Sequence, residues 1–173
     1  IADFAMRLDN DNNLANLQAA WGQLPVEVLQ PLSAMLEHVA IEPVFAEQLL
    51  AYGLNAIEHK DDIALVAALR SLSKTPAQGL TAQLVDAVLR SDMNTQSDVL
   101  LTIAGRCFST LEDPERLHVF MDCCAHHTEI EQLFVSIFTD LVAIPSIRPH
   151  LLGLLRKENR SETLARAIGR LFS

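Results

Sequence analysis

Apolar residues recur at helical spacing along almost the whole chain, and this pattern restricts the fold more than any other feature. The clearest stripe places Ile130, Leu133, Phe134, Ile137, Phe138 and Leu141 on one face of a helix. No stretch shows the sustained alternation of apolar and polar residues that marks a half-buried strand. The sequence therefore predicts an all-α protein.

Capping signals divide the chain into short helices. Thr75-Pro-Ala-Gln78 and Thr128-Glu-Ile-Glu131 have the residue order of a capping box, and Asp113-Pro114 is a third start signal. Beyond a short fragment at 2–8, we expect helices at about 13–22, 25–40 with a bend or restart at Pro31, 43–57, 61–72, 76–90, 96–109, 114–126, 129–143, 146–157 and 161–172.

Proline opens every second expected helix, and this spacing indicates a repeat. The four positions are Pro43, Pro76, Pro114 and Pro145. The intervening helices also agree, since residues 62–72 align with residues 98–108, and the end of the latter resembles residues 168–172. We therefore expect repeat-like helix pairs at about 43–72, 76–109, 114–143 and 145–172.

A period of this length, with two helices in each repeat, resembles the HEAT and armadillo-like class of helical repeat proteins. The resemblance covers roughly residues 43–172. It implies a short α-solenoid of stacked antiparallel helix pairs, which bury their apolar faces against neighbouring pairs. An irregular multi-helical bundle is the alternative, because alternating helices of equal length produce a period by themselves. An uncharacterised bacterial family with such a fold also fits, although no motif identifies one.

Length and composition favour one domain, 1–173, because half of the 173 residues are hydrophobic and no compositional break divides them. The chain begins with Ile1 rather than methionine, so we expect it to be a piece of a longer protein. Its apolar stretches are far shorter than the roughly 20 residues of a membrane span. An odd number of cysteines, three, favours a reducing compartment and hence the cytoplasm.

The net charge of −9 hides a basic C-terminal end. Residues 145–173 contain six basic residues and only two acidic ones. The six are Arg148, Arg156, Lys157, Arg160, Arg166 and Arg170. They either complement acidic neighbours and helix C-termini or form a secondary patch for an acidic partner. The overall acidity disfavours nucleic acid as a partner, and binding through these basic helices is the remaining route to it.

The segment Asp122-Cys-Cys-Ala-His-His127 gathers side chains that often bind metals. On a helical wheel, however, Cys123 and Cys124 turn to the apolar side, so we expect them and Cys107 to be small core residues. The cysteines also lack the spacing of a zinc site. His118, Asp122 and His126 share the polar face at i, i+4 and i+8 and are weak candidates for a surface chelate. A metal-binding or enzymatic module built on them is the first alternative function; no cofactor is expected.

Three arginines, Arg70, Arg106 and Arg170, occupy one repeat position, and Asp140 takes that position in the remaining repeat. One interpretation is that these residues form a ladder of alternating charge whose ion pairs connect neighbouring repeats. The other is that the unpaired arginines line a groove that binds acidic side chains or a C-terminal carboxylate. Arg70 is the member most expected to be unpaired. Because no phosphate-binding loop or hydrolase motif is present, we predict a non-catalytic protein-interaction module whose partner presents an acidic segment.

Overall fold

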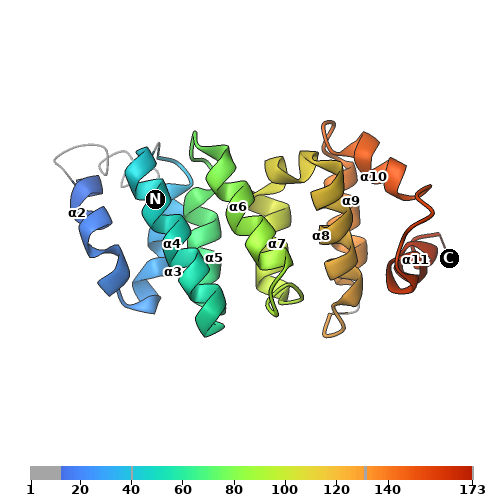
Figure 1. The fold of residues 1–173 in the computed structure, drawn as a ribbon, viewed down its shortest axis with the longest axis horizontal. Helices are drawn as coiled ribbons and strands as arrows, with labels where there is room; N and C mark the ends of the chain where they lie inside the picture. Colours follow the sequence, from blue (N-terminus) through green and yellow to red (C-terminus); the bar gives the residue numbers. More distant parts are fainter. Residues whose placement is uncertain (1–12, 40, 131, 173) are drawn as a thin grey trace. The chain divides into compact units, whose positions relative to one another are not determined.

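The computed structural model describes residues 13–39, 41–130 and 132–172 (Figure 1). Every regular element in this part of the chain is helical, which confirms the all-α prediction. The elements are α2 (Asn13–Ala20), η1 (Trp21–Gln23), α3 (Val26–Leu36), α4 (Pro43–His59), α5 (Asp62–Leu72), α6 (Gln78–Leu89), α7 (Ser97–Arg106), η2 (Phe108–Glu112), α8 (Pro114–His126), α9 (Leu133–Val142), α10 (Arg148–Leu154) and α11 (Glu162–Arg170). The fragment expected at 2–8 lies outside the described residues.

The chain divides into two compact units, residues 1–87 and residues 88–173. The boundary falls inside α6, and the single domain over 1–173 stays a prediction. The ranges expected for the helix pairs contain α4 and α5, α6 and α7, α8 and α9, and α10 and α11 respectively, and the pairing itself stays a prediction. Their stacking as a solenoid stays a prediction.

Polar side chains cap three helices where the sequence indicated a start. The side chains of Asp61, Asp113 and Ser161 accept hydrogen bonds from the backbone N–H three residues further on, at 2.9, 2.8 and 3.1 Å. Each bond satisfies one of the N–H groups that a helix N-terminus leaves without a partner. The starts of α5, α8 and α11 are therefore encoded locally.

Two predicted helix starts are wrong, and one residue of the second predicted capping box, Glu131, lies outside the described residues. The Thr75 hydroxyl accepts from Ala77 N–H at 3.3 Å, and Gln78 reaches back to the Thr75 carbonyl, so α6 begins only at Gln78. Thr128 is exposed, and α9 begins at Leu133 rather than at 129. Pro31 lies inside α3, which ends at Leu36 instead of continuing to 40.

The first unit is packed closely around α5, which contacts both α3 and α4. Gly53 in α4 allows Leu84 of α6 and Ala68 of α5 to approach it closely, because a Cβ there would lie 2.8 Å from both methyl carbons of Leu84 and 3.0 Å from Cβ of Ala68. Trp21 is 1% exposed and meets Phe45 edge-on. Its Nε1 has no hydrogen-bond partner among the described residues.

The second unit is organised around α8, which contacts η2, α9, α10 and α11. The buried face of α8 includes Leu117, Phe120, Met121 and Cys124, and the helical wheel had predicted this side for the cysteine. No helix in the described part of the chain combines the length and the apolar character needed to cross a bilayer.

Candidate functional site

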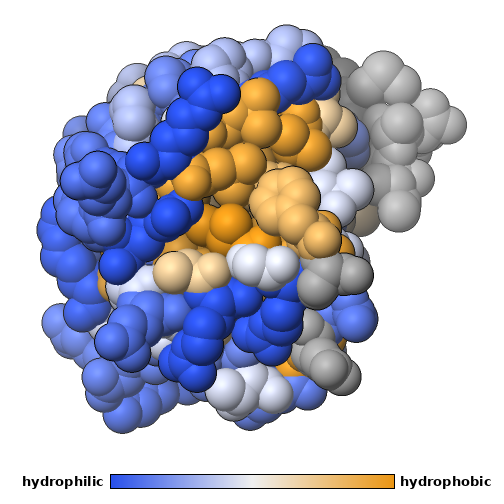
Figure 2. Space-filling model, turned by 90° about the vertical axis from the view of Figure 1, so that its right-hand side faces the viewer, coloured by the Kyte–Doolittle hydropathy of each residue, from blue (hydrophilic) through white to orange (hydrophobic). Residues whose placement is uncertain are grey.

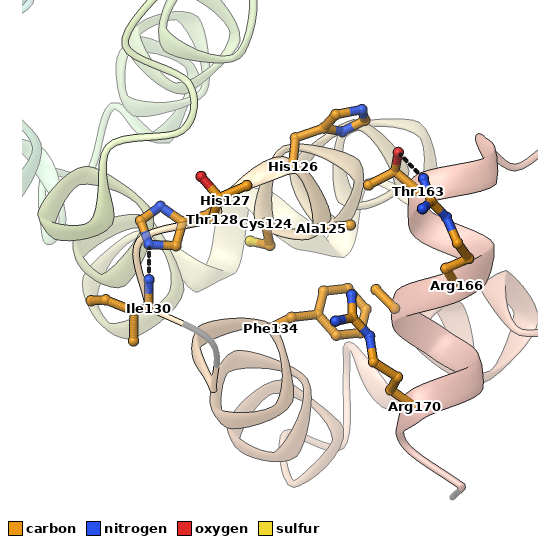
Figure 3. A pocket seen from close by; sticks show the side chains of 11 residues that line it. Cys124, Ala125, His126, His127, Thr128, Ile130, Phe134, Thr163, Arg166 and Arg170 are labelled. Atoms are coloured by element: carbon orange, nitrogen blue, oxygen red, sulfur yellow. Dashed lines mark hydrogen bonds between the residues drawn. The ribbon is translucent and has the colours of Figure 1, made fainter.

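A pocket of about 600 Å³ lies within the second unit (Figure 3). Four segments line it: the end of α8, the residues that follow α8, the first turn of α9, and α11. Its volume is within the usual range of ligand-binding clefts. The pocket is therefore large enough to hold one or two side chains of a bound partner.

The floor of the pocket is apolar. Cys124 and Ala125 from α8, Phe134 from α9 and Ala167 from α11 all line it, and all four residues are buried. Three of the four side chains are small, which leaves space between the helices. The ring of Phe138 stacks on the ring of Phe134, with the two centroids 6.3 Å apart. The floor is thus preformed and suited to an aliphatic group.

The rim of the pocket is cationic. Arg166 and Arg170 line it from α11, where a separation of four residues places them on the same side of the helix. Both residues are exposed. Among the described residues, the contacts of Arg166 are long ones within its own helix, 3.4 Å from Nε to the Glu162 carbonyl and 3.5 Å from Nη2 to the Thr163 hydroxyl. Its guanidinium can therefore turn toward an anion at little cost.

His127 fixes the wall that follows α8. Its Nδ1 lies 2.7 Å from the Thr95 carbonyl oxygen, and its Nε2 accepts a hydrogen bond of 2.9 Å from Ile130 N–H (Figure 3). Because a carbonyl oxygen can only accept and an amide N–H can only donate, these two contacts fit the tautomer that carries a proton on Nδ1. Its partner Thr95 is 32 residues away, too distant in sequence for local patterns to reveal the contact.

A contact between α8 and α11 positions the arginines. The Ser161 hydroxyl, which caps α11, also donates a short hydrogen bond to Oδ1 of Asp122 in α8. This carboxylate had been a candidate metal ligand. It instead anchors the first turn of the helix that carries Arg166 and Arg170.

The other members of the proposed chelate have separate partners. Nδ1 of His118 lies 3.1 Å from Nζ of Lys157, so the ammonium group is placed to donate to this ring nitrogen. Nδ1 of His126 lies 2.8 Å from the Asp122 carbonyl oxygen and 3.7 Å from its Oδ2. Within the described residues, no three histidine, cysteine or acidic side chains are grouped so that they could hold a metal ion.

All three cysteines are buried, as predicted. Burial raises the pKa of the Cys124 thiol well above its ordinary value, and the neighbouring Cys123 contributes in the same direction. For Cys123, burial and the nearby Asp122 carboxylate raise the pKa to about 11. Because the thiolate is the nucleophilic form, these groups are poor nucleophiles at neutral pH.

The three aligned arginines do not have equivalent surroundings. The expectation that Arg70 is unpaired is wrong, since its Nε donates to Oε1 of Glu37 at 2.6 Å within the first unit. Arg106 is the last residue of α7 and Arg170 the last residue of α11. Only Arg170 of the three lines the pocket, beside Arg166, which the sequence had assigned to the secondary basic patch.

Several residues of that secondary patch bind carbonyl groups at helix C-termini or a neighbouring acidic side chain. Arg148 donates to the Val142 carbonyl at the end of α9, and Arg160 donates to carbonyls at the end of α10. Lys157 forms an ion pair of 2.9 Å with Glu115. These contacts support the interpretation that basic residues complement helix C-termini and acidic neighbours. Arg156 is exposed and does not line the pocket.

An apolar area surrounded by hydrophilic side chains is visible on the side of the molecule where α10 and α11 lie (Figure 2). In α10, Leu152 is 45% exposed, and Phe172, which follows α11, is 74% exposed. The second unit therefore presents apolar surface as well as the pocket.

Comparison with known proteins places the chain in a family without assigning it an activity. No curated protein and no solved structure matches the sequence significantly. One family model does match, and it spans residues 1–172. This agrees with the expectation of an uncharacterised family, while the likeness to HEAT and armadillo-like repeats stays a prediction. The chain belongs to the protein family of unknown function DUF3549.

Proposed function

We propose that the protein is a non-catalytic interaction module, and that the pocket between α8, α9 and α11 binds a carboxylate-bearing segment of a partner protein. The observation that carries the proposal is the pair Arg166 and Arg170 on the rim of a pocket with a buried apolar floor. Guanidinium groups bind carboxylates through strong, directional hydrogen bonds. A partner's acidic segment would thus meet both charge and apolar complementarity.

The side chains around the pocket favour binding over catalysis. The Cys124 thiol is protonated at neutral pH because burial raises its pKa. Both ring nitrogens of His127 are engaged with backbone groups, so this imidazole is not placed to act as a general base. The pocket-lining residues therefore contain no activated nucleophile of the kinds used in acyl or group transfer.

The helix pairs are consistent with an interaction scaffold. In stacked-pair architectures, neighbouring helices present continuous surfaces to partners. We retain the α-solenoid as the arrangement that best accounts for the proline spacing, with α11 supplying the cationic edge of its binding surface. Arg70 is removed from this surface because it pairs with Glu37.

A library of short random peptides, displayed on phage and selected on the full chain, tests the proposal. We expect selected peptides to be enriched in carboxylates and to bind Arg166→Glu and Arg170→Glu about tenfold to a hundredfold more weakly, as the loss of a charge-assisted bond implies. Arg156→Glu is the matched control, because it makes the same charge change outside the pocket. Equal binding by the wild type and both pocket variants would refute the proposal.

A further inference from the structure

We infer that the pocket recognises the C-terminal residue of a partner chain, with its free α-carboxylate on Arg166 and Arg170 and its aliphatic side chain on the apolar floor. This inference rests on the proposed function and specifies the group that is bound. It distinguishes a chain end from an internal aspartate or glutamate.

The first reason is the short distance along α11 between cationic and apolar groups. Ala167 lines the floor and is 2% exposed, and it directly follows Arg166 in sequence. Arg170 is one turn further along the same helix. A ligand must therefore present a carboxylate and an apolar group close together. In a C-terminal residue both groups are attached to one Cα, whereas an internal acidic residue has no apolar group of its own.

The second reason is that the last turn of α8, which lines the pocket together with α11, carries partial negative charge, whereas the arginines of α11 are positive. Ala125 and His126 line the pocket from the last turn of α8, where carbonyl groups lack donors within the helix. This end of a helix carries partial negative charge, which disfavours a bare anion but attracts N–H groups. A terminal peptide residue has a backbone N–H on one side and a carboxylate on the other. Inorganic phosphate at neutral pH offers no comparable N–H donor.

The third reason is the charge of the rest of the chain. Residues 1–144 contain 20 acidic and seven basic residues, so the molecule repels strongly acidic segments over most of its length. A peptide that carries its single negative charge at the chain end meets less of this repulsion than a run of aspartates or glutamates. The charge pattern favours one carboxylate beside an apolar side chain.

Two display libraries of the same random peptides provide the test, one with free C-termini and one with the C-termini fused to the phage coat. We expect enrichment only from the library with free C-termini, with aliphatic residues at the last position. The best peptide is then synthesised as the acid and as the C-terminal amide, and its binding to the full chain is followed by fluorescence anisotropy. We expect amidation to weaken binding at least about tenfold.

Variants connect the measurement to this pocket. Arg166→Gln should abolish most of the preference for the acid over the amide, whereas Arg156→Gln should leave it unchanged. Ala167→Leu, which fills the floor, should weaken both forms; circular dichroism confirms that each variant remains helical.

The outcomes separate this inference from the proposed function. Equal binding of acid and amide that still depends on Arg166 overturns the C-terminal inference and leaves the carboxylate-binding module. Enrichment only from fused C-termini overturns it in favour of an internal acidic residue. No enrichment from either library overturns both proposals.

Discussion

Helices meet differently in the two units. In the first unit, Gly53 of α4 lets Leu84 and Ala68 approach so closely that even a Cβ would collide with them. In the second unit, a polar contact joins α8 to α11, and small side chains between these helices leave a pocket of about 600 Å³. The contact at Gly53 is therefore closely packed. The contact between α8 and α11, in contrast, is made through a hydroxyl–carboxylate hydrogen bond and has a pocket next to it. The candidate site lies where packing is incomplete.

The chain provides a separate probe for each unit. Trp21, the single tryptophan, is buried in the first unit, and all three cysteines lie in the second. Tryptophan fluorescence therefore reports on the unfolding of the first unit, and thiol labelling reports on the second unit.

The largest effect is expected at the closed contact. Gly53→Val should lower the free energy of unfolding by about 2–3 kcal/mol, because the added methyl groups enter occupied space between buried side chains. Urea unfolding followed by Trp21 fluorescence measures the change.

The control is another helical glycine. A Cβ at Gly79 in α6, which lies in the same unit as Gly53, would meet no atom within 4 Å, so Gly79→Ala should not lower the free energy of unfolding and should raise it by up to about 1 kcal/mol through helix propensity. If Gly53→Val were as stable as the wild type, the first unit could not be closely packed at this position, and the contrast between the units would disappear.

A smaller effect is expected at the polar contact beside the pocket. Ser161→Ala removes both the N-cap of α11 and the hydrogen bond to Asp122, and should cost about 1–2 kcal/mol. Faster labelling of the buried cysteines by a thiol reagent measures the loss. Ser146→Ala, an exposed change outside the helices, should leave the rate unaltered. An unchanged rate in Ser161→Ala would show that other contacts hold α11 in place.

The smallest effect should appear only at alkaline pH. The pKa of Cys123 is raised to about 11 in the folded chain from an ordinary value of 9.0, so the folded state binds this proton more tightly than the unfolded state. The stability that this shift contributes is present below pH 9 and is lost as the pH rises through about 11. The difference in unfolding free energy between wild type and Cys123→Ala should change over this range. A constant difference would mean that the thiol is hydrated.

Local chemistry explains which features could be predicted. The start of α8 was evident because Asp113 caps it from the adjacent residue, and the wheel correctly placed Cys124 on the buried face. The helical class and most helix positions follow from patterns of this kind, in which the interacting groups are within one or two turns of each other.

The candidate site depends on contacts between distant residues, which the sequence did not reveal. Asp122 was correctly placed on a polar face, but its partner Ser161 is 39 residues away. The predicted start of α9 was wrong, and the contact of His127 with Thr95, 32 residues away, was also not evident from local patterns. One signal had been available: Arg166 and Arg170 are separated by one helical turn, which places them on one face of α11.

The double engagement of His127 affects the thermodynamics of binding. Its ring joins the Thr95 carbonyl to the Ile130 amide and so holds the segment after α8 in place before any ligand arrives. Binding would therefore reduce the conformational entropy of the partner, but it would not require a further loss of conformational entropy in this segment of the pocket. Preorganisation of this kind lowers the entropic cost of association, so the proposed binding of a short peptide would require a smaller interface than binding to a flexible loop.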